Sequence, residues 1–544
     1  MKRPGGAVAV SGGILLSRIA GLLREAVVRG RLGLGVAGSA YSAALRVPNL
    51  LQNLLGEGVL SGSFIPVYSA MVDEDPKAGG RLAGAVASFL FLVTTGLVVL
   101  GVVFADAIGS VLLVGVGDET TDLAVELIRI MTPGVGLLVL SAWSLGVLNS
   151  HRKFFLAYAS PVLWNATQII VVSAAAVGVV DRDVAVRVAW AVTVGAGLQF
   201  LVQLPAVRRA NAYIRPNLEF GTPAFHDFLR RLGPVILGRG SAQISAFVDL
   251  VLAGLLAISA IGALAAAQVL YLLPISLFAM SVAAAELPEL SRENDHLALE
   301  RRLSSGLIRI GFFVSFTSVV YLFAGTRVVA AVYSIVPRST FGSDDIFVVA
   351  LVLGGYTLGL MAVATSRLIQ NVFYALGDTA TPAGAAIYRF SISAVVAIAV
   401  MFQFEQLFVY DGVITGFDRL LAPLQPLSQS IRDSSNAPLR LGAVGLALGA
   451  AIGAWTEFWL LRRRLIERLG RRSLTNGNWK SLVLPTAVSG LLLLLLLPVT
   501  RWAPAGVDLM LSAGPAGILY IWVSHRQGIE EATKMVRFFS RPTT

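Results

Sequence analysis

Long apolar stretches, separated by short polar segments, follow one another along almost the whole chain. A helix needs about 20 mostly apolar residues to cross a bilayer. Fourteen stretches approach this length, and they lie at 7–28, 39–68, 82–105, 123–149, 155–179, 186–207, 231–257, 260–290, 305–334, 346–375, 381–402, 441–461, 481–499 and 505–524. The pattern therefore predicts an all-α integral membrane protein with fourteen transmembrane helices.

The composition supports this interpretation and excludes several classes of protein. Of the 544 residues, 56% are hydrophobic and 14% are charged, whereas a soluble domain carries about 25% charged residues. The chain has no cysteine and four scattered histidines, which excludes disulfides and cysteine-ligated metals and makes a histidine metal site unexpected. It also has no P-loop and no nucleophile–histidine constellation, so an enzyme is the class least expected.

The net charge of +11 is distributed unevenly along the chain. Cytoplasmic loops of membrane proteins are enriched in Lys and Arg. When the N-terminus is placed inside, most of the loop Lys and Arg residues fall on the cytoplasmic side. We therefore expect both termini in the cytoplasm. No soluble basic domain is present, so we expect no nucleic-acid partner.

Three landmarks recur along the chain at nearly one offset, which predicts an internal repeat. They are Arg18 with Arg239, Pro66 with Pro288, and Pro161 with Pro382, at offsets of 221 or 222 residues. Coincidence among common residue types is the alternative explanation. Two six-helix lobes related in this way would suit a transporter that rocks about a central cavity. The predicted organisation is an N-lobe at 1–208, a cytoplasmic linker at 209–230, a C-lobe at 231–462, and two further helices with a basic cytoplasmic tail at 463–544.

The second half carries an outward-facing insertion at 403–440 that has no counterpart in the first half. Its apolar residues recur at helical spacing, which favours an interfacial helix. These residues are Val413, Ile414, Phe417, Leu420, Leu421 and Leu424.

Several charged residues fall inside the predicted spans. Each costs at least about 2.5–3.5 kcal/mol at the bilayer centre unless it is paired or solvated, so we expect a water-filled cavity between the halves. Charges near span ends can instead reach the interface, as we expect for Arg46, Arg129 and Glu457. The remaining charges are Arg18, Arg24, Arg239, Arg367, Arg389, Glu25, Glu57, Asp249 and Glu286.

The first two spans hold the densest group of these charges. Arg18 and Glu25 lie on nearly the same face of a helix, so Glu25 is expected to moderate Arg18 or to pair with an arginine of another span. The second span is interrupted at Pro48 and around Glu57, which stands between two glycines. Such breaks serve as ligand sites or hinges, although a proline kink filled by a neighbouring helix is an equal alternative for Pro48. Guanidinium groups in a wet cavity favour phosphate or carboxylate, so the cavity is expected to bind an anion.

Three motifs carry a strong resemblance to a known family. They are SRIAGLLRE at 17–25, RVPNLL at 46–51 and GEGVLSGSFIPV at 56–67. These segments resemble the MurJ/MviN family of bacterial lipid II flippases, within the MATE-like MOP exporter superfamily. The likeness extends over roughly 7–400 and includes FYALGDT at 373–379.

The resemblance implies a substrate, a mechanism and a location. The substrate would be lipid II, an undecaprenyl-pyrophosphate-linked disaccharide-pentapeptide used for peptidoglycan, flipped across the bacterial plasma membrane by alternating access through a cationic cavity. No cofactor is implied, but a coupling cation (sodium or a proton) or the membrane potential would drive transport. Membrane lipids and the cell-wall synthesis machinery are the other partners implied. The substrate-binding positions that match are Ser17, Arg18, Arg24, Asn49 and Glu57. Glu25 is a further candidate, at a position where the family usually has Asp.

The chain also departs from the family at three positions. Ser39 stands where the family usually has an acid early in span two, and Gln52 stands where a basic residue is common. The Asp-Arg pair usual in span eight is replaced by Gln268-Val269. Arg239 or Arg389 is a candidate to replace the missing arginine. Some relatives bind sodium at a carboxylate in span seven, where Asp249 stands. Because the partner residues for sodium are absent, Arg389 is a candidate to neutralise Asp249.

These departures leave other functions open. One alternative is a flippase for another polyprenyl-pyrophosphate-linked glycan, or another MOP-type exporter. A drug antiporter would be expected to have an acidic cavity, which the arginines oppose. A second alternative is a non-transporting scaffold for cell-wall assembly that has kept the fold.

Overall fold

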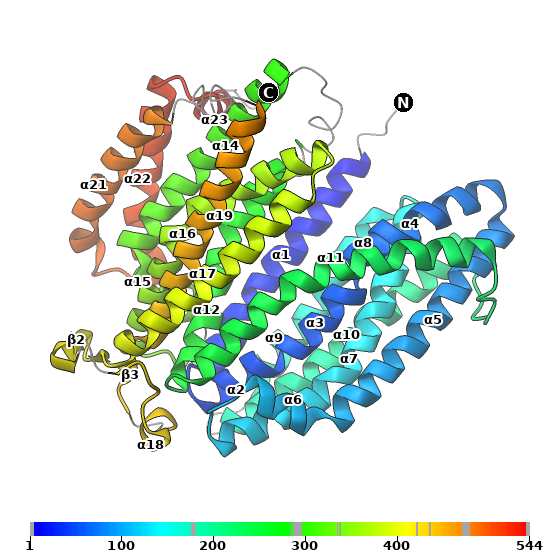
Figure 1. Cartoon of the computed structure of the whole chain (residues 1–544), viewed down its shortest axis with the longest axis horizontal. Coiled ribbons are helices and arrows are strands. Elements are labelled where there is room, and N and C mark those ends of the chain that lie inside the picture. Colours follow the sequence, from blue (N-terminus) through cyan, green and yellow to red (C-terminus); the bar gives the residue numbers. More distant parts are fainter. Residues whose placement is uncertain are drawn as a thin grey trace. The chain divides into compact units, whose positions relative to one another are not determined.

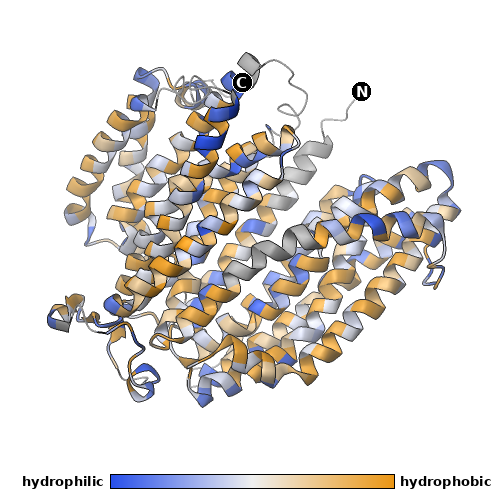
Figure 2. Ribbon diagram, viewed as in Figure 1, coloured by the Kyte–Doolittle hydropathy of each residue, from blue (hydrophilic) through white to orange (hydrophobic). Residues whose placement is uncertain are grey.

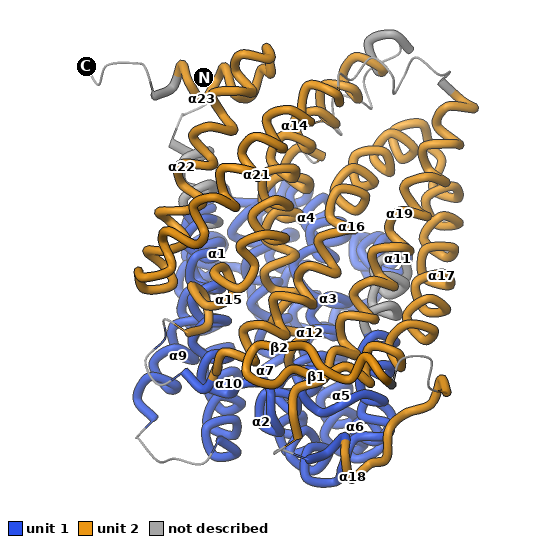
Figure 3. The backbone as a smooth tube through the Cα atoms, turned by 90° about the vertical axis from the view of Figure 1, so that its left-hand side faces the viewer, with its two compact units in different colours: residues 1–261, 336–340, 432–435 blue, residues 262–335, 341–431, 436–544 orange. Residues whose placement is uncertain are grey.

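The helices of this computed structural model group into two compact units (Figure 3), and each unit is described by itself. Unit 1 comprises Met1–Ile261 with Val336–Thr340 and Arg432–Ser435, and unit 2 comprises Gly262–Ile335, Phe341–Ile431 and Asn436–Thr544. The structure describes residues 5–175, 181–283, 286, 296–334, 336, 339–419, 423–434, 437–469 and 479–539.

Unit 1 is a helical bundle built around α7 (Figure 1). Its buried core holds apolar side chains from α4, α5, α7 and α11, among them Phe64, Val86, Val139 and Phe228. The helices are α1 (Gly5–Leu32), α2 (Val36–Ala44), α3 (Arg46–Leu55), α4 (Glu57–Glu74), α5 (Pro76–Val103), α6 (Ala105–Leu112), α7 (Asp118–Ser150), α8 (Phe154–Ala159), α9 (Pro161–Ala174), α10 (Asp181–Ala210) and α11 (Pro223–Gly254).

Unit 2 packs α14, α16 and α19 around a core that includes Leu307, Leu368 and Leu461. The helices α21 and α22 pack against α14 and α15, and Arg327 on α15 donates to Asp508 on α22 at 2.7 Å. The elements are α12 (Ser259–Pro274), η1 (Ile275–Ala279), α14 (His296–Phe323), α15 (Gly325–Tyr333), α16 (Ser343–Ala375), α17 (Ala380–Glu405), β1 (Phe408–Tyr410), β2 (Val413–Thr415), η2 (Phe417–Arg419), α18 (Gln429–Arg432), β3 (Leu439–Arg440), α19 (Gly442–Leu469), α21 (Lys480–Thr500), α22 (Ala505–Arg526) and α23 (Glu530–Phe539).

The predicted fold class, an all-α integral membrane protein, is confirmed. Among the described residues, eleven helices are long and apolar enough to cross a bilayer, and apolar residues dominate these helices (Figure 2). The three other predicted spans fall on α1, on α2 to α4, and on α11. The count of fourteen transmembrane helices therefore stays a prediction.

The second predicted span is broken into α2, α3 and α4, as its sequence suggested. The first break is at Leu45, and Pro48 lies in the first turn of α3, where a residue without an N–H is tolerated. The second break is at Gly56, whose extended backbone ends α3 and begins α4. A Cβ atom at this position would lie 2.2 Å from the Gln52 carbonyl oxygen, so the break requires glycine.

The insertion at 403–440 does not form the interfacial helix that we predicted from its apolar spacing. Instead, residues Val413–Thr415 form β2, which pairs with β1 in a three-stranded sheet of order β2-β1-β3. Tyr410 pairs with Val413, so Asp411 and Gly412 form a two-residue turn with φ of 49° and 74°. Asp-Gly between β-branched and aromatic residues is a strong signal for such a hairpin, and it overrides the helical spacing. Leu420 and Leu421 lie outside the described residues.

The predicted lobe boundaries rest on the sequence repeat and on membrane sidedness. In the structure, α11 groups with unit 1 because it packs against α3 and α4. Its Phe228 ring lies edge-on to Phe64, with ring centres 6.4 Å apart. The division into an N-lobe at 1–208 and a C-lobe at 231–462 stays a prediction.

Candidate functional site

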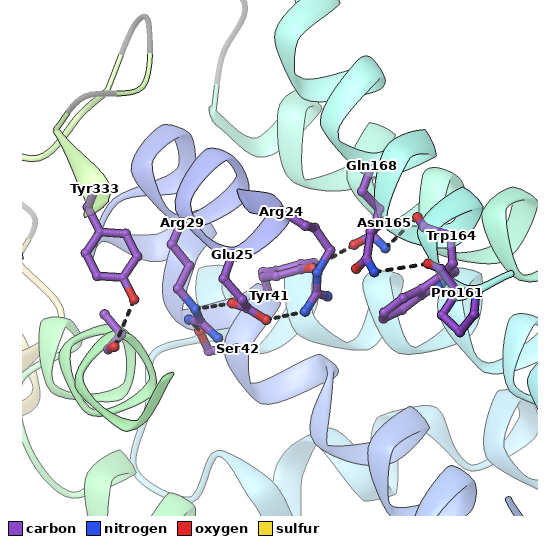
Figure 4. Close-up of polar contacts among 11 residues, drawn as sticks. Arg24, Glu25, Arg29, Tyr41, Ser42, Pro161, Trp164, Asn165, Gln168 and Tyr333 are labelled. Carbon is purple, nitrogen blue, oxygen red and sulfur yellow. Dashed lines mark hydrogen bonds and ion pairs between the residues drawn. The ribbon is translucent and has the colours of Figure 1, made fainter. Parts of the chain in front are cut away.

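The charged residues in the second half of α1 form a connected cluster in unit 1 (Figure 4). The Glu25 carboxylate forms an ion pair with Arg24 and accepts a hydrogen bond from Arg29 Nε at 2.6 Å. Arg29 also donates to Ser42 Oγ on α2 at 2.9 Å. The Arg24 guanidinium lies 4.8 Å above the centre of the Trp164 ring on α9. The cluster thus joins three helices through two arginines that share one carboxylate.

This arrangement corrects the expectation for Glu25. We predicted that Glu25 would moderate Arg18 or pair with an arginine of another span, but it pairs with Arg24 and Arg29 of its own helix. Arg29 was missed because the predicted span ended at residue 28, whereas α1 continues to Leu32. Its spacing of four residues from Glu25, which puts both side chains on one helix face, could have revealed the pair.

Polar groups with unused hydrogen-bonding capacity lie beside this cluster. The Tyr41 hydroxyl donates to Gln168 Oε1 at 3.4 Å, and Asn165 Nδ2 donates to the Pro161 carbonyl at 3.0 Å. Arg24 Nε and Asn165 Oδ1 are buried and have no hydrogen-bond partner among the described residues. Buried polar atoms are normally satisfied, so these two atoms are available to a ligand or to water.

Arg18 and Ser17 lie further toward the start of α1. The Arg18 side chain is exposed, Ser17 is half-buried, and Arg18 forms no ion pair with any carboxylate among the described residues. No carboxylate in the described part of the chain therefore pairs with Arg18, whereas Glu25 pairs with Arg24. The structure does not bring these two arginines into one ion-paired group.

Asn49 and Glu57 are the predicted site residues of the broken second span, and both are exposed. Glu57 is the first residue of α4, where a carboxylate is favoured by the N-terminal end of the helix dipole. It lies close enough to Tyr158 on α8 to act on its hydroxyl electrostatically. The Tyr158 hydroxyl in turn accepts a hydrogen bond from Asn149 on α7 at 3.3 Å.

Two of the departures from the family pattern, Ser39 and Gln268, form hydrogen bonds in the structure. Ser39 is fully buried, and its hydroxyl donates to the Ile258 carbonyl at 2.7 Å, so it fastens α2 to the segment before α12. Gln52 is exposed on α3. Gln268 donates to the Tyr356 hydroxyl at 3.0 Å, within unit 2.

The structure describes the side chains of Asp249 and Arg389, two of the three site residues predicted in the second half of the chain. The side chain of Arg239 lies outside those that the structure describes. Asp249 is half-buried on α11 in unit 1. Arg389 in unit 2 donates to Glu457 at 3.0 Å, so its partner there is Glu457. A pair between Asp249 and Arg389 would join the two units, and it stays a prediction.

The expectation that Glu457 reaches the membrane interface is wrong. Its side chain is 2% exposed, and the carboxylate accepts hydrogen bonds from Arg389 on α17 and from Gln370 on α16. Glu457 lies close to the predicted end of its span, but α19 extends to Leu469 and places it in the interior. Arg129 is half exposed and pairs with the exposed Asp106 at 2.5 Å, and its position at the membrane interface stays a prediction.

Comparison with known proteins shows which family the chain resembles. A family model described as "Lipid II flippase MurJ" matches residues 30–409. The lipid II flippase MurJ of Burkholderia cenocepacia is 29% identical over 392 residues, which cover 70% of this chain and 74% of that protein. The probable lipid II flippase MurJ of Buchnera aphidicola is 25% identical over 467 residues, which cover 85% of this chain and 83% of that protein.

Solved structures share the fold. A structure of the lipid II flippase MurJ in an inward closed conformation matches with a TM-score of 0.70 at 22% identity, over 97% of this chain and 100% of that chain. An inward-facing multidrug resistance transporter of the MATE family matches with a TM-score of 0.60 at 18% identity, over 83% and 95% of the two chains.

The described helices define a multi-pass membrane protein, whose fold is shared with the MATE-family transporter. The family model covers most of the chain, so the chain belongs to the MurJ family of lipid II flippases. The resemblance seen in the sequence motifs is confirmed. This is a family of transporters and not of enzymes.

Proposed function

We propose that this protein flips lipid II from the inner to the outer leaflet of the bacterial plasma membrane, with both termini in the cytoplasm. The headgroup would cross by alternating access through a cationic cavity. Membership of the MurJ family supports the substrate. The observation that carries the site is the α1 cluster, in which Arg24 is held by Glu25 and Trp164 while its Nε remains unpaired.

The cluster is suited to a pyrophosphate because its main cation is fixed in advance. A guanidinium donates parallel hydrogen bonds to phosphate oxygens, and such charge-assisted bonds are stronger than neutral ones. Glu25 and Trp164 hold Arg24, so little side-chain entropy is lost when the anion binds. Glu25 is shared with Arg29, which leaves the cluster with a net positive charge. The exposed Arg18, which pairs with no carboxylate among the residues that the structure describes, adds a further positive charge on the same helix.

Transport of this kind also needs an energy source, which we propose to be a coupling cation or the membrane potential. Asp249 is the candidate carboxylate for sodium or a proton, and Arg389 is the candidate to replace the ion. We expect membrane lipids, and components of cell-wall synthesis, to be the other partners.

Complementation tests the proposal. The wild type should restore growth to a bacterium depleted of its own lipid II flippase, whereas the Arg18→Ala and Arg24→Ala variants should not. Arg129→Ala is the matched control, because this arginine is also in a span but is exposed and paired at the surface. Failure of the wild type, when it is present in the membrane, would favour a non-transporting scaffold.

A second candidate is a flippase for a different polyprenyl-pyrophosphate-linked glycan. The buried Ser39 favours it, because this hydroxyl is used to bond the Ile258 carbonyl at the position where relatives carry an acid. Competition between lipid II and undecaprenyl pyrophosphate for the purified protein separates the two candidates. Equal affinity would mean that the peptidoglycan sugars are not recognised.

A further inference from the structure

Helices α8 and α9 meet at a junction formed by Ser160 and Pro161. Pro161 has no N–H, so it cannot donate the helical hydrogen bond to the Ala157 carbonyl that would continue α8 into α9. The Ser160 hydroxyl takes the place of this donor, since it donates to the Ala157 carbonyl at 3.2 Å. One buried hydroxyl thus satisfies the carbonyl that the proline leaves free.

A side chain from another helix bonds this hydroxyl. Gln203 on α10 donates from Nε2 to Ser160 Oγ, and its Oε1 accepts a hydrogen bond from Ser141 Oγ on α7 at 3.2 Å. Ser141 in turn accepts from Gln199 Nε2 on α10 at 2.9 Å. All four side chains are buried. The junction between α8 and α9 is therefore fastened to α10 and α7 by a chain of buried hydrogen bonds.

This chain of hydrogen bonds has a single direction, because each hydroxyl accepts one bond and donates another. Ser141 accepts from Gln199 and donates to Gln203, while Ser160 accepts from Gln203 and donates to the Ala157 carbonyl. Hydrogen bonds arranged in this way polarise and strengthen one another inside a protein. Gln203 is the central member, so a side chain without its amide would interrupt the chain on both sides.

The residues that follow the junction lie at the Arg24 cation. Trp164 comes three residues after Pro161, and its ring is the one below the Arg24 guanidinium (Figure 4). Asn165 donates to the Pro161 carbonyl at 3.0 Å, and its Oδ1 is buried without a hydrogen-bond partner among the described residues. Both side chains belong to the beginning of α9, so a displacement of the junction would move them relative to Arg24.

Trp164 is also held directly by α10. Its Nε1 donates to the Val192 carbonyl at 3.1 Å. A Cβ atom at Gly195 would lie 3.1 Å from the Trp164 carbonyl oxygen, so α9 and α10 approach closely at this point. Helix α10 therefore holds α9 at two places, at the Trp164 ring and, through Gln203, at the junction.

We propose that Gln203 is a positioning residue for the anion site: by holding the Ser160–Pro161 junction, it places the Trp164 ring and the Asn165 amide beside Arg24. The inference rests on the proposed function, because it concerns the same cation and the same diphosphate class of substrate. Gln203 acts on the anion through α9 and not by touching it. Its loss therefore changes how well Arg24 is held and leaves the charge of the site unchanged.

Binding of farnesyl diphosphate to the purified full-length protein in detergent tests this role, with farnesol as the uncharged probe. Gln203→Met keeps the length of the side chain but removes its hydrogen bonds. It should weaken farnesyl diphosphate binding about fivefold, within the range of one cation–π contact, and leave farnesol binding unchanged. Ser63→Ala is the control for the loss of a buried polar group, because this fully buried hydroxyl on α4 donates to the Val59 carbonyl of its own helix.

A double-mutant cycle separates positioning from a purely structural role. Trp164→Leu removes the ring that Gln203 places, so Gln203→Met should weaken diphosphate binding clearly less in the Trp164→Leu protein than in the wild type. The same fold-loss in both proteins would overturn the positioning role. An equal loss of affinity for farnesyl diphosphate and farnesol would also overturn it, since a general loosening of the helices affects both probes.

An α1 variant separates failure of this inference from failure of the proposed function. If Arg24→Gln weakens diphosphate binding while Gln203→Met does not, Gln203 has no positioning role and the proposed function stands. If the wild type binds the diphosphate no better than farnesol, both are wrong. Thermal unfolding identifies a variant that has lost its fold. In that case Ser160→Ala, which removes a smaller group from the same chain of hydrogen bonds, replaces Gln203→Met with the same expected results.

Discussion

The Arg24 guanidinium lies 4.8 Å above the centre of the Trp164 ring, while the same guanidinium is paired with Glu25. A carboxylate at one edge and an aromatic face below leave this cation with a restricted orientation. Such a cation is ready to bind an anion without first being ordered, and this is the physical basis of the proposed site.

Trp164 should therefore contribute to anion binding although it carries no charge. A cation–π contact is worth about 0.5–2 kcal/mol, so Trp164→Leu should weaken binding of a polyprenyl diphosphate by roughly 2- to 30-fold. Trp164→Phe should lie between the wild type and Trp164→Leu. Trp190→Leu is the control, because this tryptophan is 55% exposed and makes no cation–π contact with an arginine among the described residues. Equal binding by Trp164→Leu and the wild type would contradict the role of the ring.

Glu25 should be important for stability as well as for the site. Glu25→Gln leaves Arg24 and Arg29 close together without their shared carboxylate, and breaking a buried ion pair costs about 3–5 kcal/mol. The side chains here are 11–15% exposed, so we expect a clear fall in Tm. Asp227→Asn breaks the exposed pair with Arg231 and should cost about 0–1 kcal/mol. Similar Tm values for the two variants would show that the Glu25 cluster is not a structural link.

The small sheet in the insertion offers a test of the corrected fold. Gly412 and Gly416 both have positive φ, of 74° and 94°. A Cβ at Gly412 would meet nothing within 4 Å, whereas at Gly416 it would lie 2.4 Å from the Gln406 carbonyl oxygen. Gly412→Ala should therefore cost about 1–2 kcal/mol from backbone strain alone, and Gly416→Ala should cost more. Thermal unfolding that ranks them in the opposite order would contradict the hairpin geometry.

Asp378, in the connection between α16 and α17, should make stability depend on pH. Hydrogen bonds from the Thr381 backbone N–H and hydroxyl, with the nearby Arg468 guanidinium, hold the pKa of the Asp378 carboxyl below its ordinary value. The stabilisation is thus present above about pH 4, the ordinary Asp pKa, and is lost as the pH falls through the lowered pKa. Asp378→Ala should lower Tm at neutral pH, and the difference from the wild type should shrink in acid. A difference that is independent of pH would mean that the charge is not involved.

The sequence predicted the helical framework because long apolar stretches have few alternatives in a bilayer. It also predicted the break at Gly56, and it identified Arg24 as a candidate for the site. The hairpin was missed because apolar spacing was given more weight than the turn at Asp411 and Gly412.

The sequence could not reveal contacts between helices that are distant along the chain. The pairing of Arg389 with Glu457 depends on how α17 packs against α19, and no spacing rule places residues that are so far apart in sequence. The contact of Arg24 with Trp164 has the same origin, since it needs α1 and α9 side by side. Charged residues within predicted spans therefore indicated candidate site residues, but the sequence did not show which residues they contact.

We propose that this protein moves lipid II and that the Arg24 guanidinium binds the lipid during transport. The most direct test is translocation of fluorescent lipid II across proteoliposomes, measured as the fraction that becomes accessible to a reagent outside, for the wild type and for Arg24→Gln. We expect translocation by the wild type above that of protein-free liposomes, and a loss of most of this activity in Arg24→Gln, with both proteins folded and equally reconstituted. Equal translocation by the two proteins, or none by the wild type, would contradict it.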